Sequence, residues 1–295
     1  MNLSIAHLGP PGTYAEQAAL FYVNWLAKNT GVEAILCPYP SIAQTLKAVA
    51  SQQAQLAMVP VENSIEGGVT MTLDTLWQLD NLHIQLALVM PIVHTLISCA
   101  TNLEDIKTVY SHPQGLAQCQ GWLEKFLPNV QLIPINSTTE ALHQLEQDLN
   151  AAAISSARAA KLYNRPIIAN GISDYPENCT RFWLVTQDSL PTNWLPQAEI
   201  TEIDSRVSLG FSLPANVPGA LVKPLQIFAH LDINLSRIES RPTKRSLGEY
   251  LFFMDLEASE SSPKMESALA ELASHTEILR IFGSYNVLHV DALNP

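Results

Sequence analysis

The sequence lacks the features that mark membrane, secreted and nucleic-acid-binding proteins. It contains no run of about 18 apolar residues, and residues 1–8 contain no basic stretch followed by an apolar core. We therefore expect a cytoplasmic protein that does not enter membranes. Lys and Arg number 16 against 28 Asp and Glu, and the formal net charge of -12 argues against nucleic acid as a partner, because the long-range field would repel it.

Cysteine and cofactor-binding motifs are also scarce. The four cysteines, Cys37, Cys99, Cys119 and Cys179, form no C-x-x-C pair and no Cys/His spacing typical of metal ligands. Reduced thiols are the expected state in a cytosolic chain. Neither G-x-G-x-x-G nor G-x-x-x-x-G-K-[ST] occurs, so no nucleotide site is predicted. We expect neither a metal nor another cofactor.

The chain does contain enough apolar material for two domains. It has 295 residues, and 47% of them are hydrophobic. Up to about Asp188, short apolar strands alternate with helical stretches, which is typical of an α/β fold with a largely parallel sheet. The expected strands are Leu3–Leu8, Leu56–Val59, Ile84–Ser98 with a break at Pro91, Thr108–Tyr110, Ala151–Ile154 and Phe182–Thr186.

Capping boxes mark the expected helix starts. In each box a Ser or Thr hydroxyl and a Glu or Gln three residues later satisfy each other's backbone donors. The pairs are Thr13 with Glu16, Ser41 with Gln44, Ser111 with Gln114, and Ser137 with Glu140. After Ser111, apolar residues recur at helical spacing as far as Phe126, which predicts one continuous helix with a buried stripe.

The chain changes character after residue 188. Residues 189–204 contain two prolines and no sustained period, so we interpret them as a linker between domains. Residues 205–290 then follow the order β-α-β-β-α-β, which is typical of a ferredoxin-like α+β sandwich. Pro224 lies inside the first helical pattern of this segment, where it predicts a kink or a late helix start.

Four segments of the first domain contain more polar side chains than the packing of a core requires. They are Gly9–Glu16, Val59–Gly68, Ser111–Gln114 and Asn178–Phe182. Ligands bind beyond the carboxyl ends of strands in open α/β sheets, and the free N–H groups at a helix start can hold an anion. The segments therefore suggest one site, although each alone is also explained by a tight turn, a solvated His112 or ordinary strand-edge polarity.

Together these segments resemble the motifs of the prephenate dehydratase family. Gly9–Tyr14 resembles G-P-x-G-T-[FY], Pro60–Ser64 resembles P-x-E-N-S, Ser111–Cys119 resembles S-H-P-Q-A-L-A-Q-C, and Asn178–Phe182 resembles N-x-T-R-F. Glu239–Pro242 and Pro218–Leu221 are similar to the E-S-R-P and G-A-L motifs of that family's C-terminal ACT regulatory domain. Ala15 and Gly115 depart from the Ser or Thr and the Ala that are usual at these positions.

The resemblance implies a catalytic domain over residues 1–188, with two α/β lobes around a cleft, similar to type II periplasmic binding proteins. Lobe 1 would comprise about residues 1–88 and 166–188, and lobe 2 about residues 89–165. An ACT domain over residues 205–290 would follow the linker. Because the first motif begins at Gly9, we expect no chorismate mutase segment ahead of it.

The same resemblance implies decarboxylation and dehydration of prephenate to phenylpyruvate, on the route to phenylalanine. Such an enzyme must assist departure of the ring hydroxyl and hold the ring carboxylate where it can leave. Thr180 would donate a hydrogen bond to the departing hydroxyl, Arg181 would hold the pyruvyl carboxylate, and Phe182 would cover the ring. Glu62 and His112 remain alternative proton donors. The expected substrate-binding residues are Thr13, Glu62, Asn63, Ser64, Ser111, Gln114 and Asn178.

Regulation by phenylalanine is a further implication of the resemblance. Similar ACT domains bind a free amino acid between paired domains, so we expect a homodimer or homotetramer with phenylalanine at the interface. The candidate contacts are Gly219, Ala220, Leu221, Asn234, Leu235, Glu239, Ser240 and Arg241.

Two other functions stay open. Arogenate dehydratase would act on a substrate with an amino group in place of the keto oxygen, and no residue separates the two activities. A non-catalytic amino-acid sensor or solute-binding protein would use the same cleft without chemistry. Retention of Thr180–Phe182 weakens the sensor, and the missing signal sequence weakens the transport protein.

Overall fold

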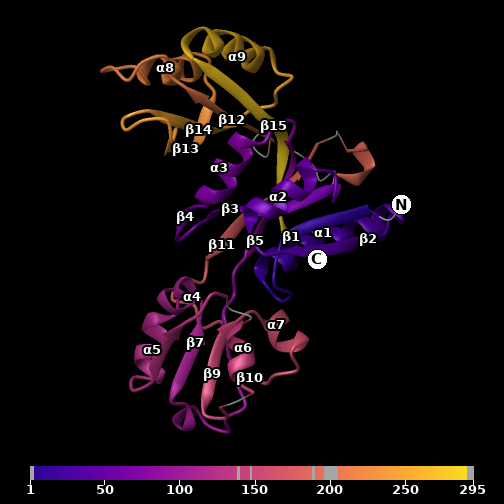
Figure 1. The fold of residues 1–295 in the computed structure, drawn as a ribbon, viewed down its shortest axis with the longest axis vertical. Helices are drawn as coiled ribbons and strands as arrows, with labels where there is room; N and C mark the ends of the chain where they lie inside the picture. Colours follow the sequence, from indigo (N-terminus) through magenta and orange to yellow (C-terminus); the bar gives the residue numbers. More distant parts are fainter. Residues whose placement is uncertain (1–2, 138–139, 147, 188–189, 196–204, 291–295) are drawn as a thin grey trace.

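The computed structural model describes residues 3–137, 140–146, 148–187, 190–195 and 205–290. Three units follow one another along the long axis of the molecule (Figure 1). The first lobe lies in the middle, the second lobe at one end, and the C-terminal domain at the other. The two-lobed α/β architecture and the ferredoxin-like C-terminal domain expected from the sequence are both confirmed.

The first lobe is built on a mixed sheet. Its strand order is β5 (His83–Pro91), β11 (Cys179–Thr186), β3 (Leu56–Asn63), β1 (Leu3–Leu8) and β2 (Ala34–Tyr39), and β4 (Gly67–Gly68) pairs with β3. β1 is parallel to β2 and β3, whereas β11 is antiparallel to both β3 and β5. The expectation of a largely parallel sheet is therefore wrong here, because the strand that returns from the second lobe enters in the opposite direction.

Helices cover both faces of this sheet and bury two separate cores. Helix α1 (Tyr14–Thr30) covers one face, and α2 (Ile42–Ala50) and α3 (Thr70–Gln78) cover the other. Alternate residues of β11 enter these cores: Phe182 packs in the core of α1, and Trp183 packs in the core of α2 and α3. The core on the α2 and α3 side also contains Phe253 and Tyr285 of the C-terminal domain.

The second lobe is a smaller α/β unit. Its strand order is β10 (Ile167–Asn170), β6 (Thr95–Ser98), β9 (Ala151–Ser155), β7 (Thr108–Ser111) and β8 (Gln131–Pro134). Around this sheet lie η1 (Leu103–Asp105), α4 (Pro113–Ala117), α5 (Gln120–Phe126), α6 (Glu140–Gln144) and α7 (Ala157–Leu162). Because β10 pairs with β6, residues 167–170 belong to this sheet. The sequence placed the return of the chain to lobe 1 near residue 166, but the chain returns only after β10.

The helix expected after Ser111 is two helices. Asp174 accepts the backbone N–H groups of Gly121 and Trp122 at 2.8 and 3.0 Å, and its own N–H donates to the carbonyl of Gln118 at 2.8 Å. These bonds cap α5 and replace the continuing helical ladder. The residue that caps α4 is His112 and not Ser111, which corrects the predicted capping pair.

The C-terminal domain joins its sheet to that of the first lobe. Its elements are β12 (Ser205–Ser212), α8 (Val222–His230), β13 (Asn234–Pro242), β14 (Tyr250–Glu257), α9 (Pro263–His275) and β15 (Ile278–His289). β15 pairs with β12 and then continues beside β5, so one ten-stranded sheet crosses both units. The long yellow strand in Figure 1 makes this connection visible. Pro224 lies in the first turn of α8, which starts late as predicted.

The segment expected to link the domains is described only in part. Its residues 189 and 196–204 lie outside the described residues. Between them, η2 (Thr192–Trp194) packs against α1, where the hydroxyl of Tyr22 donates to the carbonyl of Trp194 at 2.8 Å. No helix in the described part of the chain is long and apolar enough to cross a bilayer.

Candidate active site

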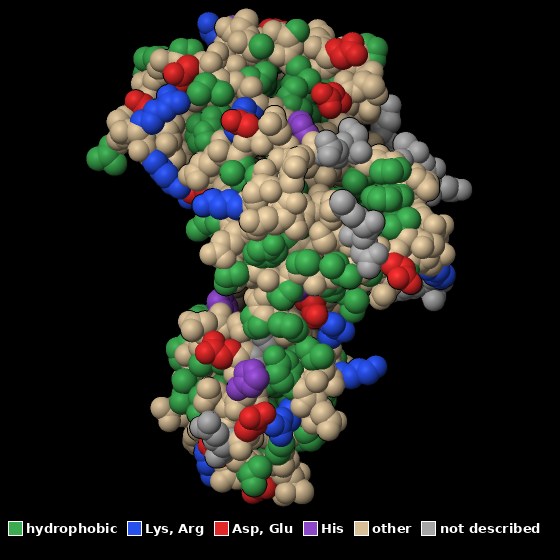
Figure 2. Space-filling model, turned by 45° about the vertical axis from the view of Figure 1, so that its right-hand side comes forward, with side chains coloured by type: hydrophobic (Ala, Val, Ile, Leu, Met, Phe, Trp, Pro, Cys, Tyr) green, Lys and Arg blue, Asp and Glu red, His purple; other side chains and the backbone are tan. Residues whose placement is uncertain are grey.

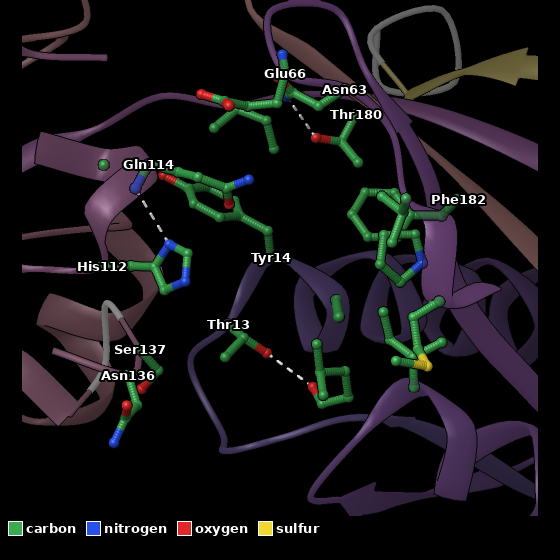
Figure 3. Close-up of a pocket in the computed structure, with 18 of the residues that line it drawn as sticks. Thr13, Tyr14, Asn63, Glu66, His112, Gln114, Asn136, Ser137, Thr180 and Phe182 are labelled. Carbon is green, nitrogen blue, oxygen red and sulfur yellow. Dashed lines mark hydrogen bonds between the residues drawn. The ribbon is translucent and has the colours of Figure 1, made fainter. Parts of the chain in front are cut away.

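A cavity of about 850 Å³ lies between the two lobes. One wall comes from the loop after β1, from β3, β4 and β11, and the other from α4 and residues 136–137. The outline of the molecule narrows between these lobes in Figure 2, and Figure 3 shows side chains from both walls facing one space. No Lys or Arg is among the described residues that line the cavity. A ligand here would meet neutral hydrogen-bonding groups and the carboxyl groups of Glu66 and Glu140.

Thr13 ends the loop between β1 and α1 and caps the helix. Its oxygen accepts the N–H of Glu16 at 3.3 Å, and its proton is donated to the carbonyl of Leu8 at 3.0 Å. The Glu16 carboxylate turns back to accept the N–H of Gly12 at 2.7 Å, and Arg158 of α7 donates to the same oxygen at 3.0 Å. The Thr13 half of the predicted Thr13–Glu16 capping box is confirmed, whereas the Glu16 carboxylate accepts the N–H of Gly12 and not that of Thr13. Thr13 lines the cavity, but its proton is already donated within the loop.

The Thr180 hydroxyl is oriented by Asn63. The amide nitrogen of Asn63 donates to the Thr180 oxygen at 3.0 Å. The amide cannot be turned round, because its oxygen accepts the backbone N–H groups of Ile65 and Glu66, each at 3.0 Å. Since the Thr180 oxygen serves as an acceptor, its proton can be donated into the cavity (Figure 3). Two residues predicted from separate motifs thus form one unit.

Asn63 also begins a chain of amides that crosses to the second lobe. Its nitrogen donates to the Asn178 oxygen at 2.8 Å, and the Asn178 nitrogen donates to the Gln118 oxygen at 2.9 Å. The Gln118 nitrogen donates back to Glu66 at 3.2 Å. Nε2 of His94 lies 2.9 Å from the Gln118 oxygen, which can only accept, so this ring nitrogen carries a proton.

When neutral, the His94 ring therefore carries its proton on Nε2. Burial lowers the pKa of His94 below its ordinary value, although the hydrogen bond to Gln118 opposes the shift. With Nε2 protonated, Nδ1 is left as an acceptor 3.1 Å from the Tyr14 hydroxyl oxygen. The same hydroxyl also donates to the Val93 carbonyl at 2.9 Å. Tyr14 belongs to α1, and His94 belongs to the segment that crosses between the lobes, so the pair ties the two together.

Arg181 and Glu62 do not line the cavity. Strand alternation puts Thr180 and Phe182 on the cavity side of β11 and Arg181 on the opposite side. The Arg181 guanidinium donates to Glu62 at 2.9 Å and to Asp255 of the C-terminal domain at 2.5 Å. The structure does not support Arg181 as the group that holds the pyruvyl carboxylate. It equally does not support Glu62 as a substrate contact or proton donor.

Ser64, Ser111 and Asn178 support the cavity without lining it. The Ser64 oxygen accepts the N–H of Cys179 at 3.0 Å and so fixes the second motif against the fourth. The Ser111 hydroxyl is fully buried and donates to the carbonyl of Ile154 at 2.8 Å. None of the three lines the cavity, so their role as direct substrate contacts stays a prediction.

Gln114 and His112 reach the cavity from the second lobe. Nδ1 of His112 accepts the N–H of Gln114 at 3.3 Å, so a neutral His112 carries its proton on Nε2. Burial lowers the pKa of His112, while Glu66 opposes the shift. His112 stays a predicted alternative donor, and it can act only through Nε2.

Several cavity residues escaped sequence reasoning. They are Tyr14, Glu66, His94, Gln118, Asn136, Ser137, Glu140 and His143. Tyr14 and Gln118 lie inside recognised motifs, so the motif spacing could have found them. His94 follows the break at Pro91, and no pattern in the sequence marks it.

Comparison with known proteins identifies the family of the chain. The family model for prephenate dehydratase matches residues 5–190, and that for the ACT domain matches residues 207–274. The chain is 35% identical to a prephenate dehydratase of Lactococcus lactis subsp. cremoris over 288 residues, which cover 97% of this chain and 98% of the relative.

Two solved structures are similar over almost the whole chain. The prephenate dehydratase of Arthrobacter aurescens in complex with L-Phe is 33% identical, with a TM-score of 0.83 over 96% of this chain and 90% of that one. GqqA, described as a novel type of quorum quenching acylase, is 26% identical, with a TM-score of 0.76 over 97% of this chain and 98% of that one.

The fold and the family matches define a lyase with a C-terminal ACT domain. The chain belongs to the prephenate dehydratase family.

Proposed function

We propose that this protein converts prephenate to phenylpyruvate, carbon dioxide and water. The observation that carries the proposal is the Thr180 hydroxyl, whose oxygen is taken by the Asn63 amide and whose proton can therefore be donated into the cavity. A ligand oxygen opposite Thr180 would receive an oriented hydrogen bond, which is the assistance that a departing hydroxyl needs.

The reaction requires two bonds to break together. The ring carbon–oxygen bond breaks as the hydroxyl leaves, and the bond to the ring carboxylate breaks as carbon dioxide leaves, so its electron pair completes the aromatic ring. Thr180 is too weak an acid to give up its proton near neutral pH, so we assign it polarisation of the leaving oxygen. The departing hydroxide becomes water by taking a proton from the solvent. Phe182, which is 2% exposed and lines the cavity, would provide the apolar wall beside the ring.

Neutral donors would hold the two carboxylates of the substrate. Gln114, Asn136 and the N-terminal end of α1 line the cavity, and no Lys or Arg does so among the described lining residues. Neutral donors bind a carboxylate less strongly than a guanidinium does. They would therefore leave the ring carboxylate better able to lose carbon dioxide.

Turnover assays separate the two substrates that the sequence left open. The purified protein is incubated with prephenate and with arogenate in turn, and phenylpyruvate and phenylalanine are followed. We expect faster turnover of prephenate. Preference for arogenate would keep the chemistry and change the substrate, whereas turnover of neither would favour a non-catalytic sensor.

Because the chain is similar to GqqA, which is described as an acylase, the assay should also test for acylase activity. Acyl transfer through Thr180 would need a base to remove its proton. The contacts of the Thr180 hydroxyl include the Asn63 amide, which donates to it and cannot act as a base. We therefore expect no release of an acyl chain from an acylated quorum signal under conditions in which prephenate is consumed.

Phenylalanine is the proposed effector, and paired ACT domains are its proposed site. The similar Arthrobacter structure is a complex with L-Phe. Gly219, at φ 81°, turns the chain into α8, while Glu239–Arg241 end strand β13, which lies at the edge of the sheet. Apolar side chains are exposed on the same domain at Val217, Val222, Ile238, Leu247 and Tyr250. A second copy would cover them.

The remaining candidate contacts are partly engaged within the chain. Asn234 donates to Glu257 at 2.7 Å, and Arg241 donates to Asp74 of α3 at 3.0 and 3.1 Å. Because Asn234 and Arg241 already have partners within the chain, we propose that a second copy completes the site for phenylalanine. We expect a homodimer or homotetramer on size-exclusion chromatography with light scattering, and inhibition of turnover by added phenylalanine.

A further inference from the structure

The rear face of β11 is held by the C-terminal domain. The side chain of Arg181 is 12% exposed, and its Nη2 contacts Glu62 at 2.9 Å and Asp255 at 2.5 Å. Asp255 belongs to β14 of the C-terminal domain, and its carboxylate is 2% exposed. A carboxylate from the regulatory domain therefore lies directly behind the strand that carries Thr180 and Phe182.

A second set of bonds fixes the Asp255 carboxylate and returns to β11. The other carboxylate oxygen accepts the hydroxyl of Ser208 at 2.6 Å, and this hydroxyl also lies 2.6 Å from that of Tyr285. Trp183 on β11 donates its ring N–H to the Tyr285 hydroxyl at 3.1 Å. Arg181 and Trp183, two residues apart on one strand face, are thus tied to the C-terminal domain through a continuous set of contacts.

The same domain also reaches β4, another part of the cavity wall. Gly68 lines the cavity, and a side chain placed on it would meet a carboxylate oxygen of Glu239 at 2.0 Å. Glu239 itself is paired with Arg237 at 2.5 Å, and Arg237 approaches Glu62 at 4.0 Å. Side chains of β13 and β14 therefore lie behind two separate segments that face the cavity.

We propose that Asp255 is a positioning residue for the reaction, which acts by holding Arg181 and thereby fixing the placement of Thr180 on the opposite face of β11. The inference rests on the proposed dehydratase function. Neighbouring residues of a strand share one backbone, so a shift of the Arg181 side chain is passed to Thr180. Loss of the Asp255 charge would leave the Arg181 guanidinium with Glu62 alone, and the strand would move to compensate. Asp255 also approaches Nη1 of Arg237 at 3.7 Å, but Arg237 would keep its pairing with Glu239.

The test compares two carboxylates that both cross from one unit to the other. Asp255→Asn removes the charge behind β11. The matched control is Asp74→Asn, which removes a pairing between α3 and the C-terminal residues Arg241 and Lys244 without touching β11. Both variants and the wild type are assayed with prephenate in the absence of phenylalanine, and kcat, KM and melting temperature are measured.

We expect kcat of Asp255→Asn to fall about tenfold with KM within about twofold, since misalignment by a fraction of an ångström weakens a bond needed mainly in the transition state. Asp74→Asn should keep kcat within about twofold of the wild type. A normal kcat in Asp255→Asn, or an equal loss of kcat in both variants, would overturn the inference.

Ser208→Ala is a second variant that tests the inference if Asp255→Asn fails to fold. It keeps the Asp255 charge and removes one hydrogen bond to its carboxylate. If Asp255→Asn does not fold, a kcat of Ser208→Ala lowered about threefold at unchanged KM supports the inference, and an unchanged kcat overturns it. A wild type that turns over neither prephenate nor arogenate overturns the proposed function and this inference with it. An active wild type with unaffected variants overturns this inference alone.

Discussion

On its cavity face, β11 presents Thr180 and Phe182 to neutral amides and apolar side chains, whereas on its rear face Arg181 and Trp183 meet charges and hydroxyls of the C-terminal domain. Both sets of residues come from one short motif. The difference shows that the motif combines two tasks, which strand alternation separates in space. The cavity face supplies an oriented neutral donor, and the rear face fixes the strand that carries it.

Removing the hydroxyl of Thr180 should have the largest effect on the cavity face. Thr180→Val keeps the shape of the side chain, and we expect kcat to fall by about a hundredfold, the scale of losing one oriented donor. Thr180→Ser keeps the hydroxyl and should stay within about tenfold of the wild type. Steady-state turnover of prephenate and melting temperatures decide the case. Near-normal turnover of Thr180→Val would remove Thr180 from the chemistry.

Reversing the hydrogen bond to Thr180 should have the next largest effect. Asn63→Asp keeps the size and the acceptor for the Ile65 and Glu66 N–H groups, but it replaces the donor that faces Thr180 with a second acceptor. The Thr180 proton would then point at residue 63, and we expect kcat to fall about tenfold or more.

The pH profile distinguishes this cause from simple misfolding. Protonation of the new carboxylate would restore a donor toward Thr180, so the kcat ratio of variant to wild type should rise as the pH falls. A ratio that stays constant with pH would contradict the assigned direction of the bond.

A side chain at Gly283 would crowd the contact between β15 of the C-terminal domain and β5 of the first lobe. Its effect is measured as a change in stability and not in turnover. Gly283 on β15 has φ 150°, and a Cβ there would lie 2.3 Å from the carbonyl oxygen of Ile84. We expect Gly283→Ala to lower the free energy of unfolding by about 1–3 kcal/mol. Gly31 also has a positive φ, of 70°, but a Cβ there meets nothing within 4 Å.

Gly31→Ala is therefore the matched control, with an expected loss of about 1 kcal/mol from backbone strain alone. Urea unfolding of the two variants measures the difference. Equal losses would mean that contact between β15 and Ile84 contributes nothing beyond the strained backbone.

In the two lobes of the first domain, the strands that the sequence predicted are the central ones. β1 and β9 are almost wholly buried, and β3 begins with a run of four buried apolar residues, so these strands gave a clear signal. Apart from the two-residue β4, the strands of these lobes without a prediction are β2, β8 and β10. They lie at sheet edges, and polar or half-exposed residues interrupt their apolar pattern. Pro38 and Pro134 fall within two of them, which an edge strand tolerates because it need not donate on its outer side.

The motifs identified residues of the site, but they could not show on which side of the strand each side chain lies. Thr180 and Phe182 were assigned correctly to the cavity wall, but the strand was expected to begin at Phe182. Because β11 begins at Cys179, Arg181 lies within the alternating part and turns to the rear. Asp255 comes from a different domain, so no local pattern could have paired it with Arg181.

The ion pair between the lobes should give the smallest effect. Burial opposes ionisation of Glu16, but the hydrogen bonds from Arg158 and Gly12 outweigh it and lower the pKa of Glu16. A lowered carboxyl pKa stabilises the fold at pH values above the ordinary carboxyl range, and this stabilisation is lost as the pH falls through the folded-state pKa.

Glu16→Gln should therefore lower the free energy of unfolding by about 1 kcal/mol at pH 7, where charge-assisted bonds are replaced by neutral ones. The difference from the wild type should shrink on acidification to about pH 3.5, because below the ordinary carboxyl pKa the unfolded wild-type chain takes up a proton before the folded chain does. Urea unfolding at both pH values measures it. A difference that grows on acidification would contradict a lowered pKa and would mean that this buried carboxylate, unlike the Arg181 cluster behind β11, is not stabilised by its arginine.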